Sequence, residues 1–298
     1  MDKAQIREEI LKIKDWRHPF ELESGIWVPL FKDWFKEWHL WRVNNLMPTT
    51  TTIVSHIFSH GMKNAKVLDT GCWDGFYGFE FLKRGAKYLK GIDLRREAIR
   101  RANLIKSYFG YTCCDFEQGN IEDIDPSRET FDITLMFGLL YHLSSPIETL
   151  KRIGEMTNSL ILIHTYALRD PTPLLVLKRE DPSKDSTGLH ALVTRPSEGA
   201  LIEMLDFAGF DIILREYPFP FYERYVNSDF GFFYGLKSSM GQHIIDNILS
   251  DLDVKETYNS KLNRSQIVRL RKSESQLEKR YIRKRVGEIL HSMIDKIF

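Results

Sequence analysis

The segment VLDTGCWDGFYGFEFLKRGAKYLKGIDL, residues 67–94, constrains the fold of this chain more than any other part of the sequence. It predicts a strand, a turn that contains two glycines, a helix, and a second strand that ends at Asp93. Glycines in such a turn let a nucleotide-like ligand approach the backbone, because they carry no side chain. Dinucleotide-binding loops need a third glycine where this chain has Trp73, since a pyrophosphate must reach several backbone amides. Trp73 therefore disfavours dinucleotide binding and indicates a ligand without a pyrophosphate.

The sequence around this segment predicts an α/β fold. From about residue 61, short apolar strands alternate with amphipathic helices, which is typical of a parallel sheet covered on both faces. Strands are expected within 65–70, 88–94, 111–124, 131–138 and 159–167, and helices within 76–85, 96–110, 146–156 and 196–210. Two closing strands, within 211–218 and 231–238, are expected to be antiparallel. The expected fold is a doubly wound Rossmann-like sheet with a helical N-terminal cap and a basic helical C-terminal extension.

Three parts of the chain differ in character. Residues 1–60 predict an aromatic-rich N-terminal cap, residues 61–238 the α/β domain, and residues 239–298 the basic helical C-terminal extension. The cap opens with a predicted helix over residues 4–14 and carries five of the six tryptophans: Trp16, Trp27, Trp34, Trp38 and Trp41. Between residues 264 and 285 the extension holds nine Lys or Arg against two acids, followed by apolar residues at helical spacing. Such a helix packs on the core or on a second copy of the chain, or binds an anionic surface.

The composition favours a soluble protein of the cytoplasm. The chain is 43% hydrophobic and 28% charged, and its net charge of +1 argues neither for nor against a polyanionic partner. Its three cysteines form no C-x-x-C pair and no disulfide framework, which fits a reducing compartment. The charged first residues do not resemble a signal peptide, and no run approaches the ~18 apolar residues that span a bilayer.

Polar residues at the ends of the predicted strands suit S-adenosylmethionine. Asp69, at the start of the turn, suits a cationic ammonium group. Asp93 comes twenty-two residues after Gly71, where a carboxylate can accept hydrogen bonds from both hydroxyls of a ribose. Asn120 and Ile121 follow the third strand, where an amide and an apolar contact can meet an adenine edge. A ligand with an ammonium group, a ribose and an adenine but no phosphate is S-adenosylmethionine.

The motifs GCWDGF and FGLLYHLSSPIETL resemble those of the class I S-adenosylmethionine-dependent methyltransferases. More narrowly, they are similar to the group related to the bacterial tRNA wobble-uridine (carboxy)methyltransferase, over roughly Gly25 to Lys237. The resemblance implies that the cofactor contacts come from the matching positions Asp69, Gly71, Gly75, Asp93, Asn120 and Ile121. It also implies that the turn from Phe137 to His142 lines the sulfonium and the substrate.

The chain departs from this group in one respect that concerns the cofactor. The carboxymethyl-transferring enzymes that it resembles hold a carboxylated cofactor with a tyrosine of the LYH turn and with basic side chains outside it. Tyr141 matches the tyrosine, but segment 30–43 offers no clear match for the basic residues, although Lys32 and Lys36 lie there. The resemblance therefore implies ordinary methyl transfer, and the basic extension lies outside it.

The candidate catalytic residues follow the fourth and fifth predicted strands. Methyl transfer to a hydroxyl needs an aligned acceptor, and a general base adds about 10²–10⁴-fold. His142 is the candidate base and Tyr141 the residue that orients the acceptor, although both can instead stabilise their own turn. His164 is a second candidate. His190 and Arg195 lie in an insertion expected to form a lid over the substrate, where Arg195 binds an anion or caps a carbonyl. No residues have metal-ligand spacing, and no required metal is expected.

The sequence thus favours an enzyme that moves a methyl group to an oxygen of a small-molecule or glycan-type acceptor. The first alternative is a tRNA wobble-uridine-modifying methyl- or carboxymethyltransferase, with the basic extension on the RNA backbone. The second alternative is a non-catalytic binding subunit that retains the fold. A homo-oligomer through the C-terminal helices also stays open. The indole of Trp73 is expected to form a wall at the methionine end, so Trp73→Gly is expected to weaken cofactor binding or change it little.

Overall fold

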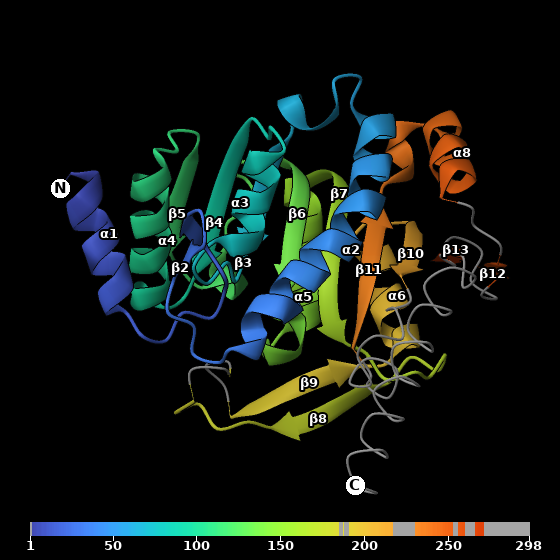
Figure 1. Cartoon of the computed structure of the whole chain (residues 1–298). Coiled ribbons are helices and arrows are strands. Elements are labelled where there is room, and N and C mark those ends of the chain that lie inside the picture. The colour runs from blue at the N-terminus through green and yellow to red at the C-terminus, as the bar shows by residue number, and fades with distance from the viewer. Residues whose placement is uncertain are drawn as a thin grey trace, which may run out of the picture.

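A nine-stranded mixed sheet forms the centre of the protein in a computed structural model, which describes residues 2–184, 187, 191–216, 230–252, 256–259 and 266–270 (Figure 1). The strand order is β5 (Cys114–Gln118), β4 (Tyr88–Asp93), β3 (Lys66–Thr70), β6 (Phe131–Phe137), β7 (Thr157–Tyr166), β11 (Phe230–Leu236), β10 (Ile212–Glu216), β13 (Gln266–Leu270) and β12 (Glu256–Asn259). The strands from β5 to β7 are parallel, and β11 is antiparallel to β7 and β10. This arrangement confirms the predicted doubly wound fold and its antiparallel closing strands.

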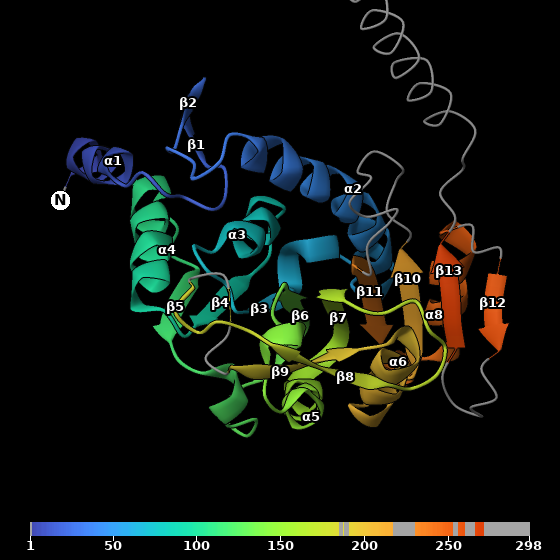
Figure 2. The same ribbon diagram turned by 90° about the horizontal axis from the view of Figure 1, so that it is seen from below.

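Helices cover both faces of the sheet (Figure 2). One face carries α2 (Trp34–Ile57), α3 (Phe76–Lys83) and α4 (Arg96–Phe109), and the other carries α5 (Pro146–Met156) and α6 (Glu198–Phe207). Because both faces are covered, the centre of β7 is almost inaccessible to solvent from Leu160 to Ile163, as its continuous apolar sequence predicts. Ser197 caps α6 by accepting a hydrogen bond from the amide of Ala200, which confirms the helix start expected at this residue.

The N-terminal segment packs against the helical face that carries α2, α3 and α4. Helix α1 (Lys3–Lys12) packs on α4, and a short hairpin of β1 (Glu21–Glu23) and β2 (Ile26–Trp27) follows. Trp16 is fully buried, and its Nε1 donates a hydrogen bond to the carbonyl oxygen of Ile10 at 3.1 Å. Trp34, at the start of α2, instead leaves 47% of its surface exposed. The aromatic residues of the predicted cap are therefore packed against the domain at Trp16 but partly exposed at Trp34.

A second hairpin crosses the edge of the sheet at which the parallel strands end (Figure 1). Its strands β8 (Leu175–Arg179) and β9 (Leu192–Pro196) are antiparallel and lie between β7 and α6 in the sequence. The sequence predicted an insertion here without predicting its strands. The five residues of β8 are all exposed, and their alternation of apolar and polar residues is too weak to mark a strand in advance.

The C-terminal extension contains both helix and strand in its described part. Helix α8 (Gln242–Asp251) packs on α2, as a helical extension predicts. The expectation of helix is wrong for Gln266–Leu270, which form β13 parallel to β10, and Ile267 and Val268 are β-branched residues that favour strands. Residues 271–298, which carry most of the predicted basic helix, lie outside the described residues. No helix in the described ranges is long and apolar enough to cross a membrane.

Candidate active site

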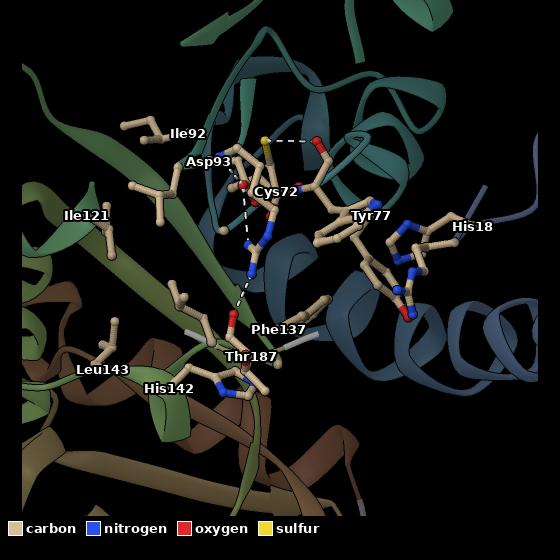
Figure 3. Close-up of a pocket in the computed structure, with 18 of the residues that line it drawn as sticks. His18, Cys72, Tyr77, Ile92, Asp93, Ile121, Phe137, His142, Leu143 and Thr187 are labelled. Atoms are coloured by element: carbon tan, nitrogen blue, oxygen red, sulfur yellow. Dashed lines mark hydrogen bonds and ion pairs between the residues drawn. The ribbon is translucent and has the colours of Figure 1, made fainter. Parts of the chain in front are cut away.

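A cavity of about 310 Å³ opens at the carboxyl ends of β3, β4, β5 and β6. The chain runs outward from β3 to β5 and returns to β6 beside β3, so the strand order reverses at this point, where doubly wound sheets bind ligands. Figure 3 shows Ile92, Ile121 and Leu143 at one end of the cavity and His18 and Tyr77 at the other. Nine of the predicted site residues line it: Asp69, Gly71, Trp73, Asp93, Asn120, Ile121, Phe137, Tyr141 and His142.

The turn after β3 holds the backbone close to the cavity. Gly71 and Trp73 have φ angles of 65° and 52°, so the tryptophan adopts the left-handed conformation that normally belongs to glycine. The amide of Trp73 donates to Asp93 Oδ2 at 3.0 Å, which ties this turn to the end of β4. Gly75 does not line the cavity. It begins α3 with a φ of 81°, and a Cβ there would collide with the rings of Phe116 and Phe79. Its role is therefore to form the turn.

Asp69 is a buried carboxyl group in the wall of the cavity. Its Oδ2 accepts a hydrogen bond from the amide of Gly78 at 3.1 Å. Burial raises the pKa of Asp69, that hydrogen bond opposes the shift, and the nearby Asp93 and Asp74 carboxylates add to it, so that the pKa is about 8. A ligand cation placed here would relieve this cost, because an opposite charge favours the ionised carboxylate.

Asp93 and the apolar end of the cavity are arranged to hold an adenosine. The Asp93 carboxylate accepts amide hydrogen bonds from Trp73 and from Arg95, the latter at 2.9 Å, which leaves lone pairs free for ribose hydroxyls. The side-chain amide of Asn120 makes one hydrogen bond through each of its polar atoms, because its oxygen accepts from the amide of Glu122 and its nitrogen donates to Asp123. One N–H and one lone pair remain for an adenine edge, beside the apolar side chain of Ile121. The cavity fits a ligand with an ammonium group, a ribose and an adenine.

His142 lies in the cavity wall beside a carboxylate that the sequence did not reveal. Its Nδ1 is 2.6 Å from Glu180 Oε2, in the hairpin segment after β8, and the two side chains are only 15% and 6% exposed. An ionised carboxylate can only accept, so Nδ1 carries the hydrogen and Nε2 keeps its lone pair. Burial lowers the pKa of His142, and Glu180 opposes this shift. The ring of Tyr141 lies against that of His142, with centroids 4.2 Å apart. The lowered pKa favours the neutral imidazole, whose Nε2 can accept a proton.

Two predicted residues, His164 and Arg195, do not line the cavity. His164 is a candidate base that the structure does not bring into the cavity: it is 3% exposed, and Arg42 Nη2 lies 2.9 Å from its Nε2. Burial, with a contribution from Arg42, holds its pKa well below the ordinary value. Arg195 does not line the cavity either, and its Nη2 lies 4.0 Å from Glu180, so it contacts the partner of His142. His190 lies outside the described residues.

The N-terminal segment supplies a polar wall that the sequence did not predict in detail. His18 and His39 line the cavity, and His18 Nδ1 lies 2.6 Å from Asp74 Oδ1. The hydroxyl of Tyr77 lies 2.8 Å from His39 Nδ1 and accepts a hydrogen bond from Arg42 at 2.9 Å. The only signal in the sequence was the aromatic density of the cap, because these contacts join residues far apart in the chain.

Comparisons with known proteins agree with this geometry. Residues 62–213, just over half of the chain, match a family described as "Methyltransferase domain". A tRNA U34 carboxymethyltransferase from Helicobacter pylori (strain Shi470) is 27% identical over 217 residues, which cover 69% of this chain and 74% of that protein. One from Pseudomonas putida (strain GB-1) is 26% identical over 70% of this chain and 60% of its own length.

A solved structure shares the fold. The N-terminal domain of EvdMO1, crystallised with SAH and D-fucose, is 21% identical, with a TM-score of 0.62 over 80% of this chain and 97% of that one. The family match, together with a cavity that suits an adenosyl ligand at the switch point of the sheet, identifies the cofactor as S-adenosylmethionine. The chain belongs to the class I S-adenosylmethionine-dependent methyltransferases.

Proposed function

We propose that this methyltransferase modifies an oxygen of the wobble uridine of tRNA. The observation that carries the proposal is the His142–Glu180 pair in the cavity wall, because an oxygen nucleophile needs a base and this pair supplies one. The names of the relatives, tRNA U34 carboxymethyltransferases, are the reason to prefer tRNA over the small-molecule or glycan acceptor that the sequence favoured.

Different residues along the cavity bind the cofactor and accept the proton of the acceptor. Under this proposal Asp69 holds the ammonium group, Asp93 the ribose, and Ile121 contacts the adenine ring; all three residues line the cavity. S-adenosylmethionine supplies a methyl group on a positively charged sulfur, so the carbon is already activated. Nε2 of His142 accepts the proton of the acceptor hydroxyl, and Glu180 stabilises the resulting imidazolium through Nδ1. The hairpin segment that carries Glu180 also closes this side of the cavity against water.

The test is transfer of a labelled methyl group. The purified protein is incubated with S-adenosylmethionine labelled in its methyl group and with bulk tRNA from a strain that lacks this gene. The tRNA is digested to nucleosides and analysed by mass spectrometry. The proposal expects label in one uridine derivative, and loss of that label in His142→Gln. A parallel reaction with a carboxylated donor tests the carboxymethyl alternative, because the mass of its product identifies a carboxymethyl group. Cofactor binding without transfer to tRNA would contradict the proposal.

A small hydroxylated molecule is the second candidate acceptor. The cavity is bordered by Arg17 and His18 of the N-terminal segment and by Thr187 of the hairpin loop, an enclosure that suits a compact acceptor. The EvdMO1 domain, crystallised with D-fucose, shares the fold. Parallel reactions with a panel of sugars and hydroxylated metabolites distinguish the two candidates. Cofactor binding with no transfer in either arm would support the non-catalytic alternative.

A further inference from the structure

A second cavity, of about 490 Å³, adjoins the cofactor cavity. It lies between the segment around Arg17, the first turn of α4 and the loop of the β8–β9 hairpin. Arg17, Trp73 and Arg95 belong to the walls of both cavities. An adenosyl ligand in the first cavity has no phosphate to place in the second. The second cavity is therefore unused by the chemistry assigned so far.

The described lining of this second cavity is strongly cationic, with five Arg or Lys side chains against two carboxylates. The carboxylates of Asp15 and Glu97 form ion pairs with Arg101. The guanidinium lies 2.8 Å from Asp15 and 3.3 Å from Glu97. Arg17 and Arg96 have no hydrogen bond or ion pair with any residue that the structure describes. Their charges are thus available to a ligand.

One further feature of the wall favours an anion. The first turn of α4 faces the cavity, and Arg95, its N-cap residue, supplies no side-chain hydrogen bond to the free amides of that turn. Such amides and the positive end of the helix dipole attract phosphate.

Thr187, in the segment between β8 and β9, contacts this site. Arg95 Nη2 donates to the carbonyl oxygen of Thr187 at 2.6 Å, a contact that Figure 3 shows, and its guanidinium lies 4.8 Å from the centre of the Trp73 ring. Arg17 lies over the same ring at 5.5 Å. The two arginines are therefore held in place by the indole before any ligand arrives, which lowers the entropic cost of binding.

We propose that the second cavity binds a phosphate of the acceptor, so that the base enters the cofactor cavity while its own or a neighbouring phosphate is held beside Trp73 and Arg96. This inference rests on the proposed function and deepens it, because under that function the ligand is a phosphodiester of the tRNA backbone. A free nucleotide carries the same chemistry, and the two sources are separated by the experiment.

The probe is inorganic pyrophosphate, titrated calorimetrically into the full chain at fixed ionic strength, with and without S-adenosylhomocysteine. Arg96→Gln removes one exposed charge of the site that makes no described contact, so it is not expected to disturb folding. Arg128→Gln is the matched control, because it removes the same charge from a side chain that is 79% exposed and outside both cavities. Pyrophosphate is expected to bind about tenfold more weakly to Arg96→Gln and unchanged to Arg128→Gln.

The possible outcomes test the phosphate site and the proposed tRNA function independently. Equal pyrophosphate affinity in the two variants, or displacement of S-adenosylhomocysteine by pyrophosphate, would overturn the site. If tRNA is the acceptor, Arg96→Gln is expected to raise its KM about tenfold at unchanged kcat. If pyrophosphate binding depends on Arg96 but the labelled methyl group is transferred only to a free nucleotide, the phosphate site is supported and the proposed tRNA function is contradicted. If the labelled methyl group is transferred only to acceptors without a phosphate, the proposal that the second cavity binds a phosphate of the acceptor is contradicted.

Discussion

Asp69 is the residue at which folding stability and cofactor binding are expected to oppose each other. Its side chain is buried, and Gly78 donates the hydrogen bond that fixes it. Asp69→Asn keeps an oxygen that can accept this hydrogen bond and removes the charge. The variant therefore isolates the cost of burying an ionised carboxylate in the wall of the cavity.

The magnitude follows from the pKa of Asp69, which burial raises from 3.8 to about 8. Since the folded state holds the proton more tightly, the stability from this group is complete below about pH 4 and is lost as the pH rises through 8. Each pKa unit corresponds to about 1.4 kcal/mol, so the loss between pH 6 and pH 9 is about 2–3 kcal/mol. The Asn variant has no such loss.

The assay is denaturant unfolding of the wild type and Asp69→Asn at pH 6, 7, 8 and 9, without ligand. The difference in the free energy of unfolding is expected to grow by about 2–3 kcal/mol in favour of Asp69→Asn over this range. Asp246→Asn, on the exposed side of α8, is the control and is expected to follow the wild type. Parallel curves for wild type and Asp69→Asn would refute the reasoning, because they would mean that burial does not penalise this carboxylate.

The same pKa predicts how cofactor binding depends on pH. The ammonium group needs an ionised Asp69, so the affinity for S-adenosylhomocysteine is expected to rise about tenfold between pH 6 and pH 7 and to level off above pH 8. At pH 8.5, Asp69→Asn is expected to bind about a hundredfold more weakly than the wild type. Equal affinity of the two proteins would show that Asp69 does not hold the ammonium group.

Three further changes test other parts of the structure. Trp73→Gly is expected to be about 1 kcal/mol more stable than Trp73→Ala, because residue 73 has a φ of 52°, and equal unfolding free energies would contradict this strain. Gly154→Ala is expected to lower the free energy of unfolding by about 2–4 kcal/mol, because the added Cβ would overlap the carbonyl oxygen of Ala208, and a neutral result would contradict the packing of α5. Glu180→Gln is expected to lower kcat about 10–100-fold and to move the acid limb of its pH profile to lower pH, because Glu180 raises the pKa of His142; an unmoved limb would argue against the pair.

The core of the fold was predictable because local patterns determined its strands and helices. Apolar runs separated by helical periods predicted the strands from β3 to β7, and the covered faces of the sheet explain why these runs are continuous. The β8–β9 hairpin and β13 were missed. The residues of β8 are exposed on both sides, and β13 forms only because β10 offers it an edge. Neither condition can be read from the local sequence.

The cofactor end of the site was predictable for a related reason. Asp69 and Asp93 lie in the last residues of β3 and β4, Ile121 follows β5, and parallel strands bring their carboxyl ends to one edge of the sheet. The same reasoning was not sufficient for His164, because side chains alternate between the faces of a strand and this one points toward Arg42 rather than into the cavity. Glu180 was missed because it lies thirty-eight residues from His142 and meets it only through the hairpin.

Calorimetric titration of the purified protein with S-adenosylmethionine, S-adenosylhomocysteine and NAD, each separately, tests the central claim most directly. The structure and the family predict that the two adenosyl ligands bind in one site and that NAD does not, because Trp73 occupies the place where a pyrophosphate would meet the backbone. Tight binding of NAD with no affinity for either adenosyl ligand would contradict the assignment of the cavity and the roles given to Asp69, Asp93 and His142.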